Sequence, residues 1–556
     1  MVIRHFDISA IQVPIVYNKY GDVDPNGLMY ILDENKEKVK EQIRQCPGTF
    51  VNLVQPLVIR VHEGDTVEIK FTNELCFAAS MNVKALPYKV QQSDGAFVGG
   101  NVSTLAQPNE SIVYRWQAEF QGAFHFSDLG NPLSSEIGSN LHGLFGAIVV
   151  EAPGSTWTDP QTGCPLKSGV FADIHHPFKP DFREFVTIFH DEAPVKNRFG
   201  ETPVDPMTGF HSMTRSINYR AEPMRNRMNL IMEGVVCPYC EGEEVHHDSW
   251  VFGDPPPTVL PRCYRADPVR WYAIHGGVKE TYIFHLHLQQ WLSEPTVQES
   301  FLNDSRALGP GETIGFDILY GAGSLQKAYG DVIYHCHLYP HFDEGMWGIQ
   351  RIHDVLEDGS RFYPDGTPIT RLMPLPDRPC PPRPTAERPG FPFFIPGKVG
   401  CRSPVPPIGY DRDFPITQLE KNALADNWKE GALFVNPCPP DAPIRRYDIV
   451  GIQRNIVYNE ANWHDPEGRF YVLAEDEEAV MNGTKNPEPL FIRALAGECI
   501  EIHFTNKFPE ELGPNAFQIL VHTLFASTHV HFVKFDVLSS DGANTGWNYF
   551  TGAAHN

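Results

Sequence analysis

An internal repeat relates the first residues of the chain to its last fifth. The segment PLVIRVHEGDTVEIKFTN at residues 56–73 returns as PLFIRALAGECIEIHFTN at residues 489–506. In both copies apolar residues alternate around a Gly-Asp or Gly-Glu turn, which is typical of a β-hairpin. The pattern of residues 6–18 also recurs over residues 447–459. We therefore predict two copies of one β domain.

Length and proline content predict several such domains. A chain of 556 residues is too long for one hydrophobic core, and three or four domains are expected. Its 49 prolines favour many loops and edges over long helices. We predict an all-β fold with β-sandwich domains at 1–155, 182–355 and 446–556, the third incomplete, and a Pro-rich extended linker at 356–445.

Charge and targeting patterns exclude some classes of protein. The formal net charge of −24 argues against binding to nucleic acid or to an anionic membrane. No stretch has the roughly 18 consecutive apolar residues of a transmembrane helix, and a Sec signal peptide is not expected. Eleven cysteines in a chain of this length do not make a disulfide scaffold, so the redox compartment stays open.

The densest set of candidate ligands lies in DVIYHCHLYPHFDEGMWG at residues 331–348. His335, Cys336 and His337 alternate on a predicted strand, so the imidazoles leave one face and the thiolate leaves the other. His341 follows five residues after the cysteine, and Met346 follows five residues later. A thiolate, an imidazole and a distant thioether are the ligands of a blue-copper site. Because the thiolate and the two flanking imidazoles leave opposite faces of the strand, we expect two metal sites to share it.

Two further histidine pairs have the spacing of a strand. His285 and His287 lie in YIFHLHLQQW, about fifty residues before the HCH motif, and His529 and His531 form the same pair in the third domain. Residues two apart on a strand point the same way, so each pair presents both imidazoles together. We expect these pairs and the HCH histidines to form one metal cluster rather than separate surface pairs.

The repeat shows what stands at the equivalent place in the first domain. STHVH at 527–531 corresponds to SMNVK at 80–84, and Ser-Asp-Gly-Ala follows both at the same distance. His529 and His531 thus have Asn82 and Lys84 as counterparts. A protonated lysine cannot ligate copper, so we predict a first domain without copper ligands.

These motifs resemble those of the multicopper oxidases. The HCHxxxHxxxxM pattern at 335–346 is similar to the last copper motif of that family. The resemblance implies cupredoxin-like, Greek-key sandwiches, a type 1 copper on Cys336, His341 and Met346, and a trinuclear cluster of type 2 and type 3 copper on the histidine pairs, where dioxygen is reduced to water.

The order of the motifs narrows the resemblance. HCH precedes HVHFVKFDVLSSDG here, as in the N-terminal part of the large manganese-oxidising multicopper oxidases of the MnxG type. That resemblance implies Mn(II) as the electron donor, with small partner subunits or a further C-terminal part of the enzyme. It is also consistent with association with a spore surface.

Two departures from the family pattern affect the expected activity. The fourth histidine pair of the family would correspond to GAFHFSD at 122–128, and counting the same interval in the third domain passes beyond Asn556, so we expect a truncated product or a fragment. The family has HxxHxH where this chain has Tyr282 before His285 and His287. A phenol is a poor substitute for an imidazole ligand. His275 could take its place only if the chain reversed sharply between the two residues. We therefore expect type 1 copper to bind weakly or with an altered colour.

Several other residues have two interpretations each. Asp541 matches the family's carboxylate for proton delivery, or it is a plain Asp-Gly turn. Asp343 and Glu344 flank His341 and are either Mn(II) ligands or solvated loop acids. A further group is either a structural zinc site, a disulfide or free thiols: Cys237, Cys240, His246, His247 and Cys263. We interpret His175, His176 and the run His190-Asp191-Glu192 as surface or strand-end residues.

Three function classes follow. The first is a copper oxidase that acts on Mn(II), and the second is the same enzyme type acting on phenols, Fe(II) or Cu(I). The third is a copper-binding relic that cannot turn over, which Tyr282 and the missing fourth pair favour.

Overall fold

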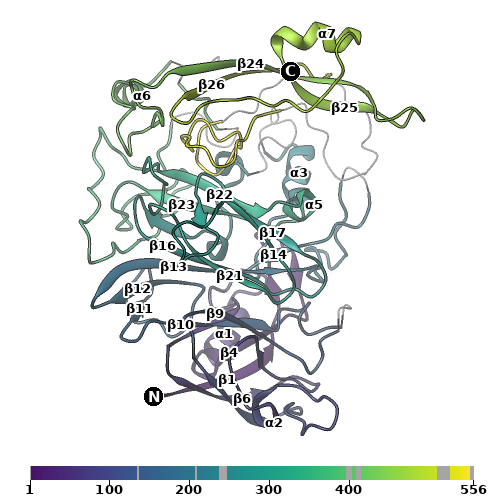
Figure 1. Cartoon of the computed structure of the whole chain (residues 1–556). Helices are drawn as coiled ribbons and strands as arrows, with labels where there is room; N and C mark the ends of the chain where they lie inside the picture. Colours follow the sequence, from purple (N-terminus) through teal and green to yellow (C-terminus); the bar gives the residue numbers. More distant parts are fainter. Residues whose placement is uncertain are drawn as a thin grey trace. The chain divides into compact units, whose positions relative to one another are not determined.

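The computed structural model consists mostly of short strands with few helices, and the predicted all-β class is confirmed (Figure 1). It describes residues 2–133, 137–206, 209–236, 247–395, 403–407, 415–509 and 526–550. The chain divides into two compact units: residues 1–226, 255–325 and 332–391 form the first, and residues 227–254, 326–331 and 392–556 form the second. No helix among the described residues is long and apolar enough to cross a membrane.

The first sandwich packs two four-stranded sheets face to face. Apolar residues alternate along its strands, so that Ile8, Ile69 and Phe71 of one sheet meet Phe126 and Ile148 of the other in one buried core. One sheet has the order β4 (Leu28–Leu32), β1 (Ile3–Gln12), β6 (Thr66–Asn73), β8 (Ser111–Gln117). The other has the order β5 (Leu57–His62), β10 (Phe145–Glu151), β9 (Gly122–Ser127), β7 (Asn82–Val83). Helix α1 (Asp33–Gln45) follows β4.

The second sandwich has an aromatic core. Trp271 lies with its ring edge against Tyr334, at 4.9 Å between centroids, and 5.6 Å from Phe284, which comes from the opposite sheet. The first sheet contains β11 (Thr156–Thr158), β12 (Phe171–His176), β13 (Lys179–His190), β16 (Val269–His275) and β21 (Thr313–Asp317), with β14 (Ser216–Ile217) beside β13. The second contains β15 (Arg262–Tyr264), β23 (Trp347–His353), β22 (Gly330–Cys336), β17 (Tyr282–Leu286) and β20 (Ser305–Leu308).

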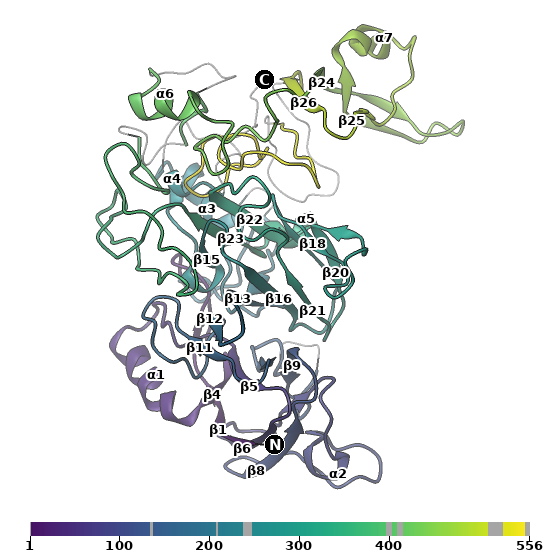
Figure 2. The same cartoon turned by 60° about the vertical axis from the view of Figure 1, so that its left-hand side comes forward.

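The repeat predicted from the sequence is present in the second unit as a three-stranded sheet. Its order is β25 (His464–Leu473), β24 (Ile444–Val457), β26 (Cys499–Asn506), and Figure 2 shows these strands next to α7 (Glu477–Asn482). The register repeats that of β4, β1 and β6, so Tyr471 is the counterpart of Tyr30. Each tyrosine donates its hydroxyl at 2.5 Å to the backbone oxygen of the equivalent serine, Ser80 or Ser527.

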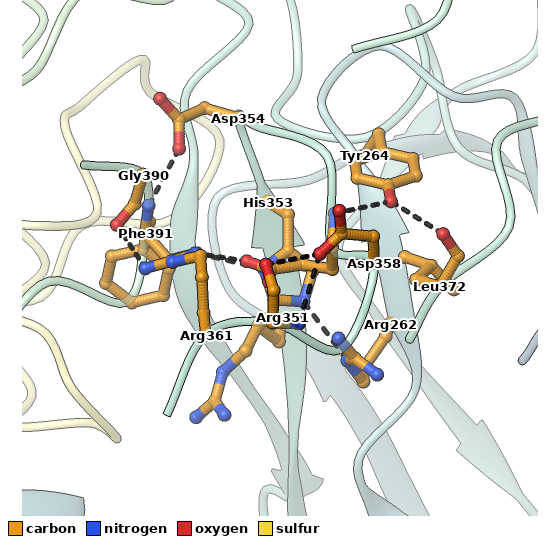
Figure 3. A network of polar contacts seen from close by, with 12 residues as sticks. Arg262, Tyr264, Arg351, His353, Asp354, Asp358, Arg361, Leu372, Gly390 and Phe391 are labelled. Carbon is orange, nitrogen blue, oxygen red and sulfur yellow. Dashed lines mark hydrogen bonds and ion pairs between the residues drawn. The ribbon is translucent and has the colours of Figure 1, made fainter. Parts of the chain in front are cut away.

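The proline-rich stretch after β23 differs from its prediction over residues 356–391. Ile369, Leu372 and Phe391 are buried, so this part packs against the second sandwich rather than only covering it. A buried polar network fastens it (Figure 3): Arg262 donates Nε–H to His353 Nε2 at 3.1 Å, and His353 Nδ1–H donates to the Phe391 oxygen at 2.9 Å. Further along lie α6 (Gln418–Leu424) and a Cys438–Cys499 disulfide.

The two equivalent tyrosines make a matched stability test. Tyr30 is fully buried, whereas Tyr471 is 39% exposed. We expect Tyr30→Ala to lower the free energy of unfolding of the first domain by about 3–5 kcal/mol, because it leaves a cavity in a packed core. Tyr471→Ala should cost the third domain only about 1 kcal/mol. Native-state hydrogen exchange of β1 and β24 amides measures both values, and equal losses would contradict the assignment of core and exposed copies.

Candidate metal centre

Four of the predicted histidines gather on one face of the second sandwich. Strand β17 pairs antiparallel with β22, with His285 opposite His335 and Phe284 opposite Cys336. Because side chains alternate along strands, this register places His285, His287, His335 and His337 on the same face. Their ring centroids lie 4.7–5.6 Å apart.

The ring nitrogens of these histidines are oriented for a shared ion. His287 Nε2 lies 3.3 Å from His335 Nε2. The opposite nitrogen of two rings is engaged with backbone oxygens: His285 Nδ1–H donates to Asp304 at 2.8 Å and His335 Nδ1–H to Cys336 at 2.9 Å. A backbone partner on Nδ1 fixes the tautomer that leaves Nε2 as a metal donor. The histidine groups of the described residues could therefore hold metal ions.

The other face of β22 carries the thiolate site. Cys336 is fully buried, and His341 Nδ1 lies 3.4 Å from its Sγ. The Ile283 N–H donates to Sγ at 3.5 Å. His341 lies in α5 (Tyr339–Asp343), and Met346 N–H donates to the His341 oxygen at 3.0 Å. Burial raises the pKa of the Cys336 thiol, so a metal that displaces its proton is needed to hold the thiolate.

These donors fit copper. A cysteine sulfur beside an imidazole nitrogen, with a buried thioether nearby, is a soft and borderline donor set, whereas magnesium and calcium prefer oxygen ligands. Hydrogen bonding to the sulfur is one of the features that tune such a site. His341 Nε2–H donates to Glu280 Oε2 at 2.8 Å, which orients the ring and leaves Nδ1 toward the sulfur.

Tyr282 does not offer its oxygen to this site. Its hydroxyl donates to Asp191 Oδ1 in a very short hydrogen bond, and its ring lies edge-on to His341 at 5.5 Å. Burial, and then the Asp191 charge, raise the pKa of Tyr282, so the phenol stays protonated. Asp191 also accepts the Lys279 N–H at 2.7 Å. Of the two predicted settings, surface or strand end, the structure shows the second: His190 is the last residue of β13 and Asp191 follows it, and both are fully buried.

The sharp reversal that would bring His275 near Tyr282 exists. Strands β16 and β17 are joined by a turn at Gly276 and Gly277, and the rings of His275 and Tyr282 stack at 4.1 Å. His275 Nδ1 accepts the Gly277 N–H at 3.1 Å, and its Nε2–H donates to the Glu280 oxygen. Both ring nitrogens are therefore bonded to the turn.

The acids beside His341 are arranged differently from the prediction. Asp343 is buried, and Glu344 accepts a hydrogen bond from Arg215 Nε at 2.5 Å. Glu280 is 43% exposed and contacts both His341 and Arg215. The carboxylate that links the imidazole to the surface is therefore Glu280, which the sequence reasoning missed because it lies far from the HCH motif.

The histidine pair of the third domain belongs to the second unit. His529 Nδ1–H donates to the Asp541 backbone oxygen at 2.7 Å, with the Asp541 carboxylate 3.2 Å away, and the His531 ring lies 5.1 Å from that of His529. Asp541 is buried, so it orients His529 directly. That this pair joins the other four histidines in one cluster stays a prediction.

The first domain keeps the same loop without ligands. Asn82 Nδ2–H donates to the Asp94 oxygen at 2.7 Å, as His529 does to Asp541, and Lys84 Nζ–H donates to Asn82 Oδ1 at 2.8 Å. His125, in the position expected for the fourth motif, is buried with both ring nitrogens unpartnered. Burial, with the nearby Lys84 charge, lowers the pKa of His125 to about 3, so its ring is neutral.

The candidate zinc residues are only partly described. Cys237, Cys240 and His246 lie outside the described residues, whereas Cys263 is buried in β15. Gln350 Nε2–H donates to the Cys263 sulfur at 3.6 Å, and its thiol donates to the Arg351 oxygen at 3.8 Å. Cys263 is thus a protonated core thiol, and burial raises its pKa.

Comparisons with known proteins found partial similarities to copper proteins. A family model described as multicopper oxidase matches residues 38–155. A probable nitrite reductase-hydroxylamine oxidoreductase fusion protein of Kuenenia stuttgartiensis is 25% identical over 317 residues, which cover 57% of this chain and 29% of that protein. The chain thus matches less than a third of that relative.

Solved structures of similar fold include a multicopper oxidase, with a TM-score of 0.39, 16% identity, and 63% of this chain and 89% of that chain covered. A copper nitrite reductase of Nitrosomonas europaea has a TM-score of 0.37 and 17% identity, with 63% and 94% covered. The family match lies within the first domain, so it shows that this domain is similar to the multicopper oxidases.

Proposed function

We propose that this chain is part of a copper oxidase that couples one-electron oxidation of Mn(II) at a type 1 site to four-electron reduction of dioxygen at a histidine cluster. The observation that carries the proposal is the place of Cys336 on β22, with its thiol on one face and its neighbours His335 and His337 on the other. Consecutive covalent bonds therefore join the two sites.

The residues of this chain have separate roles in such a reaction. Cys336, His341 and Met346 would hold the type 1 copper, and His285, His287, His335, His337, His529 and His531 would hold the cluster. Copper, when bound, supplies the one-electron redox chemistry. The buried setting of Cys336 keeps water from the thiolate, and the Ile283 N–H holds its sulfur in place.

Asp541 would deliver protons in this reaction. Its carboxylate lies beside the His529 ring, in a buried loop. A carboxylate there can pass protons to reduced oxygen by general acid catalysis.

Mn(II) as the donor is supported by the carboxylate at the surface end of His341. Glu280 presents a hard oxygen ligand within hydrogen-bonding distance of that imidazole. A divalent cation on Glu280 would lie one hydrogen bond from a type 1 ligand. The net charge of −24 also favours cations near the surface.

Other donors and a silent relic are the rival functions. Phenols, Fe(II) and Cu(I) require no dedicated pocket, and Tyr282 in place of a histidine ligand favours a relic. Nitrite is a further acceptor to assay, because one relative is named as a probable nitrite reductase fusion protein.

Copper content, spectra and oxygen uptake on one sample test the proposal. We expect copper-loaded protein to show a thiolate-to-copper absorption band and to consume oxygen when Mn(II) is added. Cys336→Ser should remove the band, whereas Cys263→Ser, which removes a buried thiol from the core of the same sandwich, should keep it. Protein that binds copper and shows the band but takes up no oxygen with any donor would support the relic instead.

Tyr282→His should strengthen the type 1 site. The new imidazole would lie beside His341 and supply a neutral nitrogen where the phenol supplies none. We expect a stronger visible band and tighter copper retention by about tenfold, or ~1.4 kcal/mol. Tyr282→Phe is the control, because it removes the hydrogen bond to Asp191 and adds no ligand. An unchanged band in the histidine variant would contradict the assignment of position 282.

Glu280→Gln should separate manganese from other donors. Without the carboxylate, kcat/KM for Mn(II) should fall about tenfold, whereas the rate with a phenolic donor should change little. Glu192→Gln is the matched control, because Glu192 is a partly exposed acid that pairs with Lys279 of the same turn. If kcat/KM fell equally with Mn(II) and with the phenolic donor, Glu280 would act on the type 1 copper site and would not bind manganese.

A further inference from the structure

The sheet of the third domain exposes a face that is core in the first domain. Tyr471 and Ile500 are both 39% exposed, whereas their counterparts Tyr30 and Val67 are fully buried. The residues themselves keep the same arrangement: Tyr471 packs edge-on to Phe504 at 5.8 Å, as Tyr30 packs on Phe71 at 6.0 Å. The two copies therefore differ in what covers them.

The segment that precedes β26 is also uncovered. In the first domain its counterpart is β5, which is buried and pairs parallel with β10. Residues 490–494 form no strand, and Phe491 is 75% exposed where its counterpart Val58 is fully buried. Among the residues that the structure describes, no strand pairs with this apolar segment, although it alternates like a strand.

The first domain shows which strands cover the equivalent sheet. Strand β8 pairs antiparallel with β6, placing Trp116 opposite Val67 and Tyr114 opposite Ile69. Strand β9 follows β8 and brings Phe126 to within 5.5 Å of the Tyr30 ring. Strands β8 and β9 belong to the two different sheets of the sandwich, so β8 covers the edge of this sheet and β9 covers its face.

The edge of β26 has the residues to pair with a strand like β8. Among the described residues, β26 pairs only with β24, so its other edge offers backbone groups to an incoming strand. The following residues are identical in the two copies: Glu68 and Glu501, Ile69 and Ile502, Phe71 and Phe504, Thr72 and Thr505, Asn73 and Asn506.

We propose that β26 and the adjoining apolar face bind a partner polypeptide segment with two consecutive strands like β8 and β9, the first pairing with the edge of β26 and the second lying over the apolar face. Backbone hydrogen bonds along the edge supply affinity, and side chains on alternate positions supply specificity. The segment needs aromatic residues opposite Ile500 and Ile502 and an arginine opposite Glu501. In the first domain that arginine is Arg115, whose Nε–H donates to Glu68 at 2.6 Å.

The charges of β26 favour this occupant over a second copy of the same strand. Glu501 lies at the edge and is bonded to His503 at 2.8 Å and Arg446 at 3.1 Å, both on exposed side chains. An incoming arginine can replace either contact. A second β26 strand would bring another glutamate and no arginine to this edge.

Hydrogen exchange on the whole chain tests the proposal, with a synthetic peptide of residues 111–127 as the probe. We expect the amides of residues 490–494, and those amides of β26 that point away from β24, to exchange rapidly without the peptide and to become protected when it is added. A peptide with Arg115→Glu should bind about tenfold more weakly, because it sets like charges opposite each other. The experiment needs no copper, so its result is independent of the proposed oxidase activity.

Two chain variants control for the site. Ile500→Asp should abolish the protection, whereas Val457→Asp, at an exposed apolar residue of β24, should leave it unchanged. Protection of the outward-facing β26 amides before the peptide is added would overturn the proposal, and so would equal binding of both peptides or no protection at a saturating concentration. A dimer that protects residues 489–506 and dissociates with Ile500→Asp would assign the face to a second copy and overturn the proposal as well.

Discussion

The antiparallel pairing of β17 with β22 is the constraint on which the rest of the centre depends. Its register sets His285 opposite His335, and His337 N–H donates to the Ile283 oxygen at 2.7 Å to continue it. A slip by one residue would turn every side chain of one strand to the other face and separate the imidazoles. Since the thiol and the imidazoles alternate on one strand, the same register also fixes the thiolate site on the opposite face.

At position 282, where the resemblance implies a histidine ligand, the neighbouring residues bind and cover a tyrosine instead. Asp191 is held by backbone N–H groups of the β16–β17 turn and takes the Tyr282 hydroxyl, and the His275 ring covers the phenol. A buried phenol that is hydrogen-bonded to a carboxylate is satisfied without a metal. Tyr282 is therefore part of the packed core. Its replacement by histidine adds a possible ligand and also removes the hydrogen bond to Asp191.

Much of this arrangement could be predicted from the sequence, because strand periodicity and the repeat are local signals. The all-β class is confirmed, and the HxH and HCH spacings place four imidazoles on one face as strand alternation requires. Contacts between residues distant in sequence could not be predicted. Glu280, Asp191 and Arg215 reach the thiolate site from separate loops, and nothing in their spacing indicates it. The packing of Ile369 and Leu372 was missed because proline content predicts extended chain but not what its apolar residues meet.

The loop that carries His529 and Asp541 and its counterpart in the first domain have the same conformation, although only the first of them carries candidate metal ligands. Gly95 has a φ of 68° and Gly542 a φ of 80°, and a Cβ at either would lie 2.5 Å or less from a backbone oxygen, so glycine is required at both. Asn82 makes the same bond to Asp94 that His529 makes to Asp541, although the first domain has no ligands there. The loop conformation is thus set by the glycine and by a side chain that donates to the backbone. A metal would bind to a loop already shaped for it, and its ligands can be exchanged for Asn and Lys without loss of the domain.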